Sequence, residues 1–294
     1  MAVLSNDTVS SDIAEIIPSE RISQALQYAN LPEPVVLRIG WSEAVPPGTG
    51  ATCNLPSVSA DAVPAGNKTE GDEFARVTLE TSELTVTGGY VGFGRFMSYE
   101  AINDAAFDVV AISTQNAVRY IMDRIDADGF VLNDSLTSAE SHAGAALTDE
   151  HVLQALTTYM LLDVSKGAPK ALVLNPKQIG DWTKDLSQSG GAYLGGDAAS
   201  QSVAQLIGPD AGFMGVKHGC QVFVSNNCPV AAGDATGCLV PMGTFSPLAF
   251  RSWDPLRVQQ ENVPGRTGVD VWYSVRYGFA LANQNGVKII SDGA

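Results

Sequence analysis

The sequence is poor in basic residues and in charge altogether. It has 17 lysines and arginines against 32 aspartates and glutamates, a net charge of −15, and charged residues make up only 17% of the chain. Binding to nucleic-acid phosphates needs a basic patch, and no short window here is rich in lysine or arginine. We therefore expect no sequence-specific nucleic-acid binding. The low charge leaves neutral surface for contacts with other chains, although a well-packed monomer fits it equally.

Histidine and cysteine are scarce and badly spaced for metal binding. No two of the three histidines lie three or four residues apart: His142, His151 and His218. The four cysteines include no Cys-x-x-Cys pair: Cys53, Cys220, Cys228 and Cys238. Four cysteines in a chain of this length do not form a secreted disulfide framework. We expect no metal, no cofactor and free thiols.

Common catalytic motifs and membrane segments are also missing. The sequence has no phosphate-binding loop of the G-x-x-x-x-G-K-[ST] type and no G-x-S-x-G nucleophile elbow. The stretch Asp126–Gly129 resembles part of a calcium loop, but Arg124 stands at the first ligand position. A long charge-free run, Ala235–Phe250, is interrupted by prolines and glycines, so we expect no membrane span. Met1–Asp12 lacks the features of a secretory signal, which favours the cytoplasm.

The first third of the chain looks extended. Residues 1–32 have too few large apolar side chains to form a core and are typical of an arm. Between the strand-like segments Val35–Trp41 and Ala75–Thr87 lies a long stretch rich in proline and glycine. A structureless loop of this length is unusual inside a compact domain. It is either covered by a neighbouring subunit or is a disordered surface loop.

A long helix is the strongest local prediction. Tyr99–Ala127 contains neither glycine nor proline and repeats apolar residues at helical spacing. Ser98 is expected to cap its start, and Asp126–Gly129 to end it. Such a helix would be roughly 40 Å long. The preceding glycine-rich run, Gly88–Gly94, predicts a bend between strand and helix.

The remainder mixes helices and strands, so the fold class is α+β. One helix is expected after Thr148, with the apolar face Val152, Leu153, Leu156, Tyr159 and Met160. Another follows the strand Ala171–Leu174, with Asn175 as its cap and an inward face of Ile179, Trp182 and Leu186. The later strands are predicted at Gln221–Ser225, Gly237–Met242, Pro247–Trp253, Leu256–Val263, Val269–Arg276, Phe279–Ala282 and Val287–Ile290. Pro264–Gly268 reads as a hairpin tip.

Five stretches in a fixed order resemble a known family. They are IIPSERISQAL from Ile16, GRFMSYEAINDAAFDVVAISTQNAVRYIMDRIDADGF from Gly94, ALVLNPKQIGDWTKDLSQSGG from Ala171, GCQVFVSNNCP from Gly219 and VWYSVRYGFALANQNGVKII from Val271. Together they resemble the major capsid proteins of tailed bacteriophages, which have the Hong Kong 97 fold. The resemblance covers nearly the whole chain.

The resemblance implies a domain plan. It places an N-terminal arm in residues 1–32, an extended β-hairpin loop in 33–87, and a peripheral domain with a long spine helix in 88–140. An α/β axial domain follows in 141–244. Residues 245–275 return to the peripheral domain with a hairpin, and residues 276–294 form terminal strands in the axial domain.

The resemblance also implies a function and partners. The chain would be a structural protein, not an enzyme, forming hexamers and pentamers of an icosahedral shell around double-stranded DNA in the virion. Partners would be a portal protein and separate scaffolding and cement proteins, with assembly in the host cytoplasm. Contacts between subunits are expected at Pro46, Pro47, Gly48, Cys53, Lys68, Pro264, Gly265 and Arg266. The alternatives are an encapsulin-like nanocompartment shell and a soluble α/β enzyme or binding protein with a Pro/Gly-rich lid.

Overall fold

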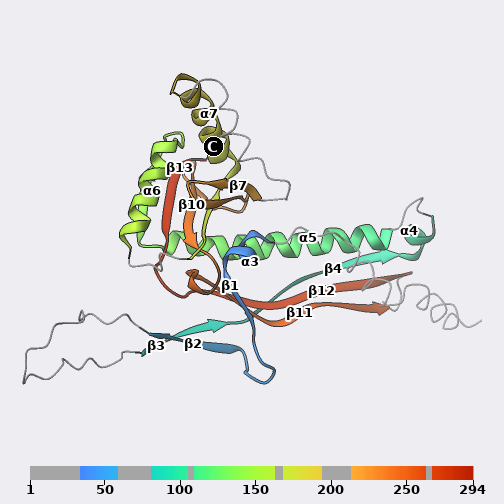
Figure 1. Ribbon diagram of the computed structural model, residues 1–294. Helices are drawn as coiled ribbons and strands as arrows, with labels where there is room; N and C mark the ends of the chain where they lie inside the picture. Colours follow the sequence, from blue (N-terminus) through green and yellow to red (C-terminus); the bar gives the residue numbers. More distant parts are fainter. Residues whose placement is uncertain are drawn as a thin grey trace, which may run out of the picture.

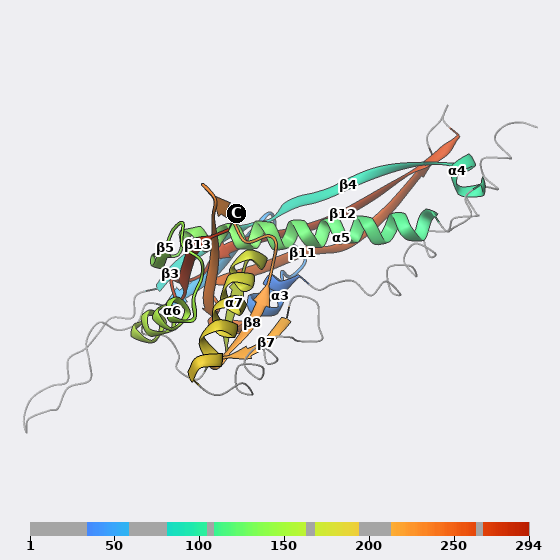
Figure 2. The same cartoon turned by 90° about the horizontal axis from the view of Figure 1, so that it is seen from above.

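The computed structural model describes an elongated molecule, whose described part has two large β-sheets and a two-stranded hairpin (Figure 1). The described residues are 34–58, 81–104, 109–162, 168–193, 213–262 and 267–293. The expected arm, Lys68 and Pro264–Arg266 lie outside them. A sheet of four strands and the long helix α5 (Val109–Phe130) run along the molecule, and a sheet of seven strands stands at one end of α5 (Figures 1 and 2).

The four-stranded sheet packs one face against α5. Its strands are, in order, β1 (Trp41–Ala44), β11 (Leu248–Asn262), β12 (Gly268–Leu281) and β4 (Gly89–Ser98). Alternate side chains of β12, beginning with Val271 and Tyr273, point toward Ala117 and Ile121 of α5 and form a buried cluster. The 22 residues of α5 extend about 33 Å, so this core is long and narrow.

The long helix begins at Tyr99 as predicted, but its end differs from the prediction. The structure has a short helix α4 (Tyr99–Asp104) followed by α5, and residues 105–108 lie outside the described part. Ser98 accepts a hydrogen bond on Oγ from the amide of Ala101 at 3.2 Å, which confirms the expected cap. Gly129 does not end the helix, because α5 continues to Phe130 and a 3₁₀ turn, Val131–Ser135, follows. A Cβ at Gly129 would lie 2.6 Å from Val36, so this glycine permits close packing instead.

The prediction of a strand at Val35–Trp41 is wrong in its first part. Val35–Ile39 forms the helix α3, and only Trp41 begins a strand, β1, which pairs in parallel with β11. The reason is long-range: the amide of Val36 donates to Oδ1 of Asp126 on α5 at 2.9 Å. A carboxylate at the first turn satisfies an amide that would otherwise lack a partner, and this outweighs the weak helix preference of valine.

The seven-stranded sheet is covered on both faces. Its main order is β5 (Ser138–His142), β13 (Val287–Asp292), β10 (Asp234–Pro241), β6 (Lys170–Leu174), β8 (Cys220–Val224) and β7 (Phe213–Lys217), with β9 (Val230–Ala231) beside β10. Leu172 and Leu174 of β6 pack under α6 (Asp149–Leu161) and α7 (Pro176–Tyr193). Ala171 and Val173 belong to the cluster that contains α3 residues.

Both helices of this layer begin where the sequence indicates. The amide of Lys177 donates to Oδ1 of Asn175 at 3.0 Å, and Ile179, Trp182 and Leu186 are buried as predicted. The expected apolar face of α6 is only partly right. Leu153 and Met160 are 42% and 58% exposed, because α6 contacts the sheet beside β5 and β13 with its other side.

Several strands predicted as separate pieces are continuous. β11 joins two of them, with shifts of register near Pro255, and β12 joins two others. Gly278 lies inside β12, where a Cβ would be 2.4 Å from the carbonyl oxygen of Thr87. This glycine allows β3 to pass close by and is not a strand end. β12 also runs across the expected boundary between residues 275 and 276, and the domain limits themselves remain predictions.

A two-stranded hairpin projects at one end of the molecule (Figure 1). It consists of β2 (Thr52–Val58) and β3 (Thr81–Thr87), paired from Thr52 with Thr87 to Val58 with Thr81. The second strand was predicted, but its partner is β2 and not Val35–Trp41. Leu55 and Val86 are buried in a cluster with Ala249 and Ala280, which fixes the base of the hairpin to the end of the four-stranded sheet.

The role of Asp126 can be tested with three variants. Asp126→Ala removes the acceptor for the Val36 amide and should lower the free energy of unfolding by roughly 1–3 kcal/mol. Asp126→Asn keeps an acceptor and removes a buried charge, so it should be at least as stable as the wild type at neutral pH. Asp123→Ala, at an exposed position of α5, is the control and should change little. Urea unfolding measures all three; equal losses for Asp126→Ala and Asp126→Asn would contradict this role.

Candidate functional site

Four of the residues expected to contact other subunits are described, and they lie at or beside the hairpin. Pro46, Pro47 and Gly48 precede the hairpin strand β2, and Cys53 lies on it. The strands flanking residues 263–266 end at Asn262 and begin at Gly268, at the other end of the four-stranded sheet (Figure 1). Lys68, Pro264, Gly265 and Arg266 fall outside the described residues. That these residues contact other subunits remains a prediction.

The turn before β2 is exposed and strongly bent. Pro46, Pro47 and Gly48 are exposed, and Gly48 and Gly50 have φ of 91° and 85°. Only glycine adopts these angles without strain, which explains the glycines in this turn. Thr49 donates from Oγ1 to the carbonyl of Pro46 at 2.7 Å and holds the turn in shape. The turn is thus a preformed surface feature.

The four cysteines are free thiols in different surroundings. Cys53 is half-buried against the cluster at the base of the hairpin. Cys220, Cys228 and Cys238 are buried around the seven-stranded sheet, which with its helices is called the axial half below. Burial raises the pKa of Cys238 to about 12. A thiol with a raised pKa is protonated at neutral pH and unreactive. The three buried cysteines are therefore packing residues.

The outer face of the four-stranded sheet carries large exposed aromatic side chains that sequence reasoning missed. Tyr90, Phe96 and Trp272 are 70%, 40% and 48% exposed. The guanidinium group of Arg276 lies 5.1 Å from the ring centre of Tyr90 on the same face. Alternation along β12 was a usable signal, because every second residue from Asp270 faces away from α5.

The glycine-rich run belongs to this face and is not a bend. Gly89–Ser98 forms the strand β4, and only Gly88 precedes it. Cβ atoms at Gly88 and Gly94 would lie 2.6 and 2.7 Å from the rings of Trp253 and Trp272. At Gly92 a Cβ would lie 2.2 Å from the backbone oxygen of Tyr273 on β12. The glycines make room for aromatic rings and for a close strand, a role that the sequence alone did not reveal.

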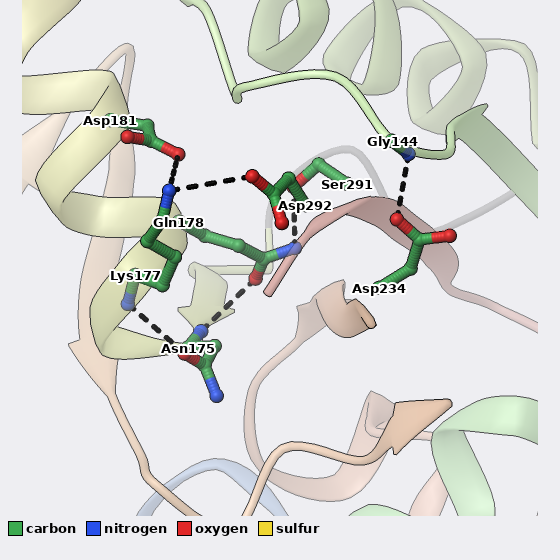
Figure 3. A network of polar contacts seen from close by, with 8 residues as sticks. All are labelled: Gly144, Asn175, Lys177, Gln178, Asp181, Asp234, Ser291 and Asp292. Carbon is green, nitrogen blue, oxygen red and sulfur yellow. Dashed lines mark hydrogen bonds and ion pairs between the residues drawn. The ribbon is translucent and has the colours of Figure 1, made fainter. Parts of the chain in front are cut away.

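A polar network ties the axial half together where α7 begins (Figure 3). The buried Gln178 donates from Nε2 to Oγ of Ser291 at 2.8 Å and to the carbonyl of Ala235 at 2.9 Å, and its Oε1 accepts from the amide of Asn175 at 3.0 Å. A buried side-chain amide is stable only when its donors and acceptor are paired. Gln178 therefore fixes α7 against β10 and β13.

Ion pairs at the rim of this network extend the connection. Nζ of Lys177 lies 3.1 Å from Asp181 and 3.4 Å from Asp292 (Figure 3). Asp234 accepts on Oδ1 from the amide of Gly144 at 2.7 Å, which joins β10 to the turn after β5. These bonds connect α7 with β13 and β10 with the turn after β5.

The described part of the chain contains no group of three or more metal-binding side chains. Among the described helices, none is long and apolar enough to cross a membrane. What this part presents instead is an elongated, well-packed body with a projecting hairpin and an aromatic face.

The fold is shared with shell-forming proteins of low sequence similarity. It resembles the capsid of the cyanophage P-SCSP1u, with 10% identity, a TM-score of 0.64 and 90% of each chain covered. The head of the Helicobacter pylori bacteriophage KHP40 gives 10% identity and a TM-score of 0.61, over 91% of this chain and 92% of that one. A virus-like particle from Pyrococcus furiosus gives 12% identity and 0.57, over 92% and 98%.

These likenesses show that the fold is the Hong Kong 97 fold. No curated protein matches the sequence. Residues 81–290 match the model of the family described as phage capsid protein, and the chain belongs to that family. It is a shell-forming structural component of a phage capsid and not an enzyme.

Because β4 lies so close to β12, alanine substitution should have different effects on stability at two glycines of β4. Gly92→Ala places a methyl group against the backbone of Tyr273, which cannot move away without breaking the ladder, and should lower the free energy of unfolding by about 1–3 kcal/mol. Gly89→Ala is the matched control, because no atom lies within 4 Å of its Cβ position. Thermal unfolding of both variants tests this; equal melting temperatures would mean that the register of β4 is different.

Proposed function

We propose that this chain builds the hexamers and pentamers of an icosahedral tailed-phage shell that encloses double-stranded DNA. Its shape carries the proposal: the hairpin β2–β3 and the far ends of β11 and β12 project in opposite directions from one body (Figure 1). Projections at opposite ends favour head-to-tail contacts, in which two different surfaces meet. Such contacts close into rings when each subunit turns by a fixed angle.

The hairpin is the part that most needs a neighbour. Among the described strands, β2 pairs with β3 alone, so the second edge of β2 is open. Two-stranded hairpins are marginally stable in water. Leu55 and Val86 bury only the base of this one. Cover from an adjacent subunit would stabilise the remainder, and the exposed Pro46–Gly48 turn lies beside it.

The aromatic face supplies contact area of a suitable kind. Tyrosine and tryptophan are enriched in protein interfaces, and Tyr90, Phe96 and Trp272 are exposed together on β4 and β12. Neighbouring glycines have no side chains, so only backbone lies on the sheet surface between these rings. A second subunit would therefore meet a surface already rich in rigid aromatic groups.

The enclosed DNA would not be bound by sequence. The net charge of −15 repels phosphates, which suits a container through which a duplex must slide during filling. A portal protein, and separate scaffolding and cement proteins, complete the proposed assembly, which takes place in the host cytoplasm. The virus-like particle from Pyrococcus furiosus has the same fold, but the family match favours a phage shell over a nanocompartment.

Shortening the hairpin tests the proposal directly. Replacing residues 59–80 by Asn-Gly would join Val58 to Thr81 through a two-residue turn that matches their observed pairing. We expect a folded subunit with an unchanged circular dichroism spectrum that no longer forms shells or rings in sedimentation and negative-stain microscopy.

The wild-type chain and Gly89→Ala, purified in the same way, serve as assembling controls, with neighbouring scaffold and portal genes co-expressed. Normal shells from the shortened chain would remove the hairpin from the assembly contacts. Failure of the wild type to assemble even with its neighbouring genes would overturn the proposed function itself.

A further inference from the structure

The three histidines come from different elements and meet around the first turn of α6. His142 ends β5, His151 lies in the first turn of α6, and His218 lies between β7 and β8. The rings of His142 and His151 are stacked, with centroids 3.6 Å apart and planes inclined by 10°. The stack leaves His151 half-buried. The chain thus places two titratable rings face to face at a helix start.

His151 also closes the cap of α6. The amide of His151 donates to Oγ1 of Thr148, and Nδ1 of His151 accepts from the amide of Thr148, each at 3.4 Å. This reciprocal pair is a capping box in which histidine stands where glutamate or glutamine is usual. Nδ1 accepts a hydrogen bond only when it carries no proton. Protonation of His151 at Nδ1 therefore breaks one half of the cap.

A second consequence of protonation is electrostatic. A positive charge at a helix N-terminus faces the positive end of the helix dipole. Nε2 of His142 is buried with no hydrogen-bond partner among the described residues, and the His142 ring lies directly against that of His151. Two charged rings at 3.6 Å repel each other. The lost cap bond, the helix dipole and the repulsion from His142 all act against a charged His151.

The acidic groups nearby oppose these effects only in part. Glu150 and Asp185 raise the pKa of His151, but burial and His142 lower it by more. Asp149 is engaged by Trp182 and His218, at 2.9 and 2.7 Å. Two further charged neighbours interact with other groups. Glu140 of β5 accepts a hydrogen bond from the hydroxyl of Thr158, and the charge of Lys217 acts on Asp149.

We propose that His142 and His151 form an acid-sensitive latch between β5 and α6, which opens the first turn of α6 when the pH falls below neutrality. Burial and the neighbouring His142 lower the pKa of His151 below its usual value. A histidine with a lowered pKa adds stability above its unfolded pKa, about 6.5, and loses it as the pH falls toward the folded pKa.

The latch goes beyond shell formation, because it lies within one subunit. Leu153, Met160 and Leu161 lie on the outer side of the same helix and are 42%, 58% and 82% exposed. Loosening the start of α6 at acidic pH changes how this apolar side is presented at the β5 edge of the axial half (Figure 2). Acid would therefore alter one edge of each subunit while the body of α7, β10 and β13 stays fixed.

Hydrogen exchange of the purified subunit tests the latch. Exchange in residues 148–152 would be compared at about pH 7.5 and about pH 5.5, after correction for the intrinsic rate. We expect an additional increase of about fivefold at the lower pH in the wild type, which corresponds to the loss of a typical cap. His151→Gln keeps the capping acceptor without a titratable ring and should show no additional increase.

His218→Gln is the matched control, since it removes a histidine of the cluster without touching the stack or the cap. It should keep the acid-dependent increase of the wild type. An equal increase in His151→Gln and wild type, or no increase in the wild type, overturns the latch. Because the unassembled subunit is measured, neither result depends on whether shells form.

Discussion

The carboxylate of Asp126 is the point on which the arrangement of the two sheets depends. It lies on α5, accepts from the Val36 amide of α3, and receives the Ser225 hydroxyl at 3.4 Å from the segment after β8. Burial raises its pKa, and these hydrogen bonds counteract that rise. A buried acceptor without a cation persists only where several donors converge. One side chain thereby joins α5, α3 and the segment that follows β8 of the seven-stranded sheet.

Around this point, packing follows the two-residue period of the strands. Leu172 and Leu174 of β6 pack in one buried cluster, and Ala171 and Val173 pack in another. This single strand therefore separates two clusters. Glycine is used where backbones come too close for any side chain, as at Gly92 and Gly278. Close packing of this kind makes the body of the subunit rigid. Changes of shape on assembly would therefore fall mainly on the hairpin and on the far ends of β11 and β12.

Local patterns predicted much of this fold and little of its surface. The caps at Ser98, Thr148 and Asn175 were predictable, because capping depends on residues within one turn. α3 was not, because its start is completed by Asp126, ninety residues away. The aromatic face was missed for the same reason, because pairing of β4 with β12 joins segments that are far apart in the sequence. The histidine stack was missed although its residues are near in sequence, because only the packing of α6 beside β5 brings the two rings face to face.

The interruptions in β11 determine where the subunit can yield. Its pairing with β12 shifts between Ser252 and Asp254 and again between Asp254 and Arg257, around Pro255. A sheet bends most easily where its ladder is broken, while α5 alongside resists bending over its whole length. Strain arising from different local curvature would therefore concentrate in these few residues. One chain could then occupy positions that are not geometrically identical without repacking either core.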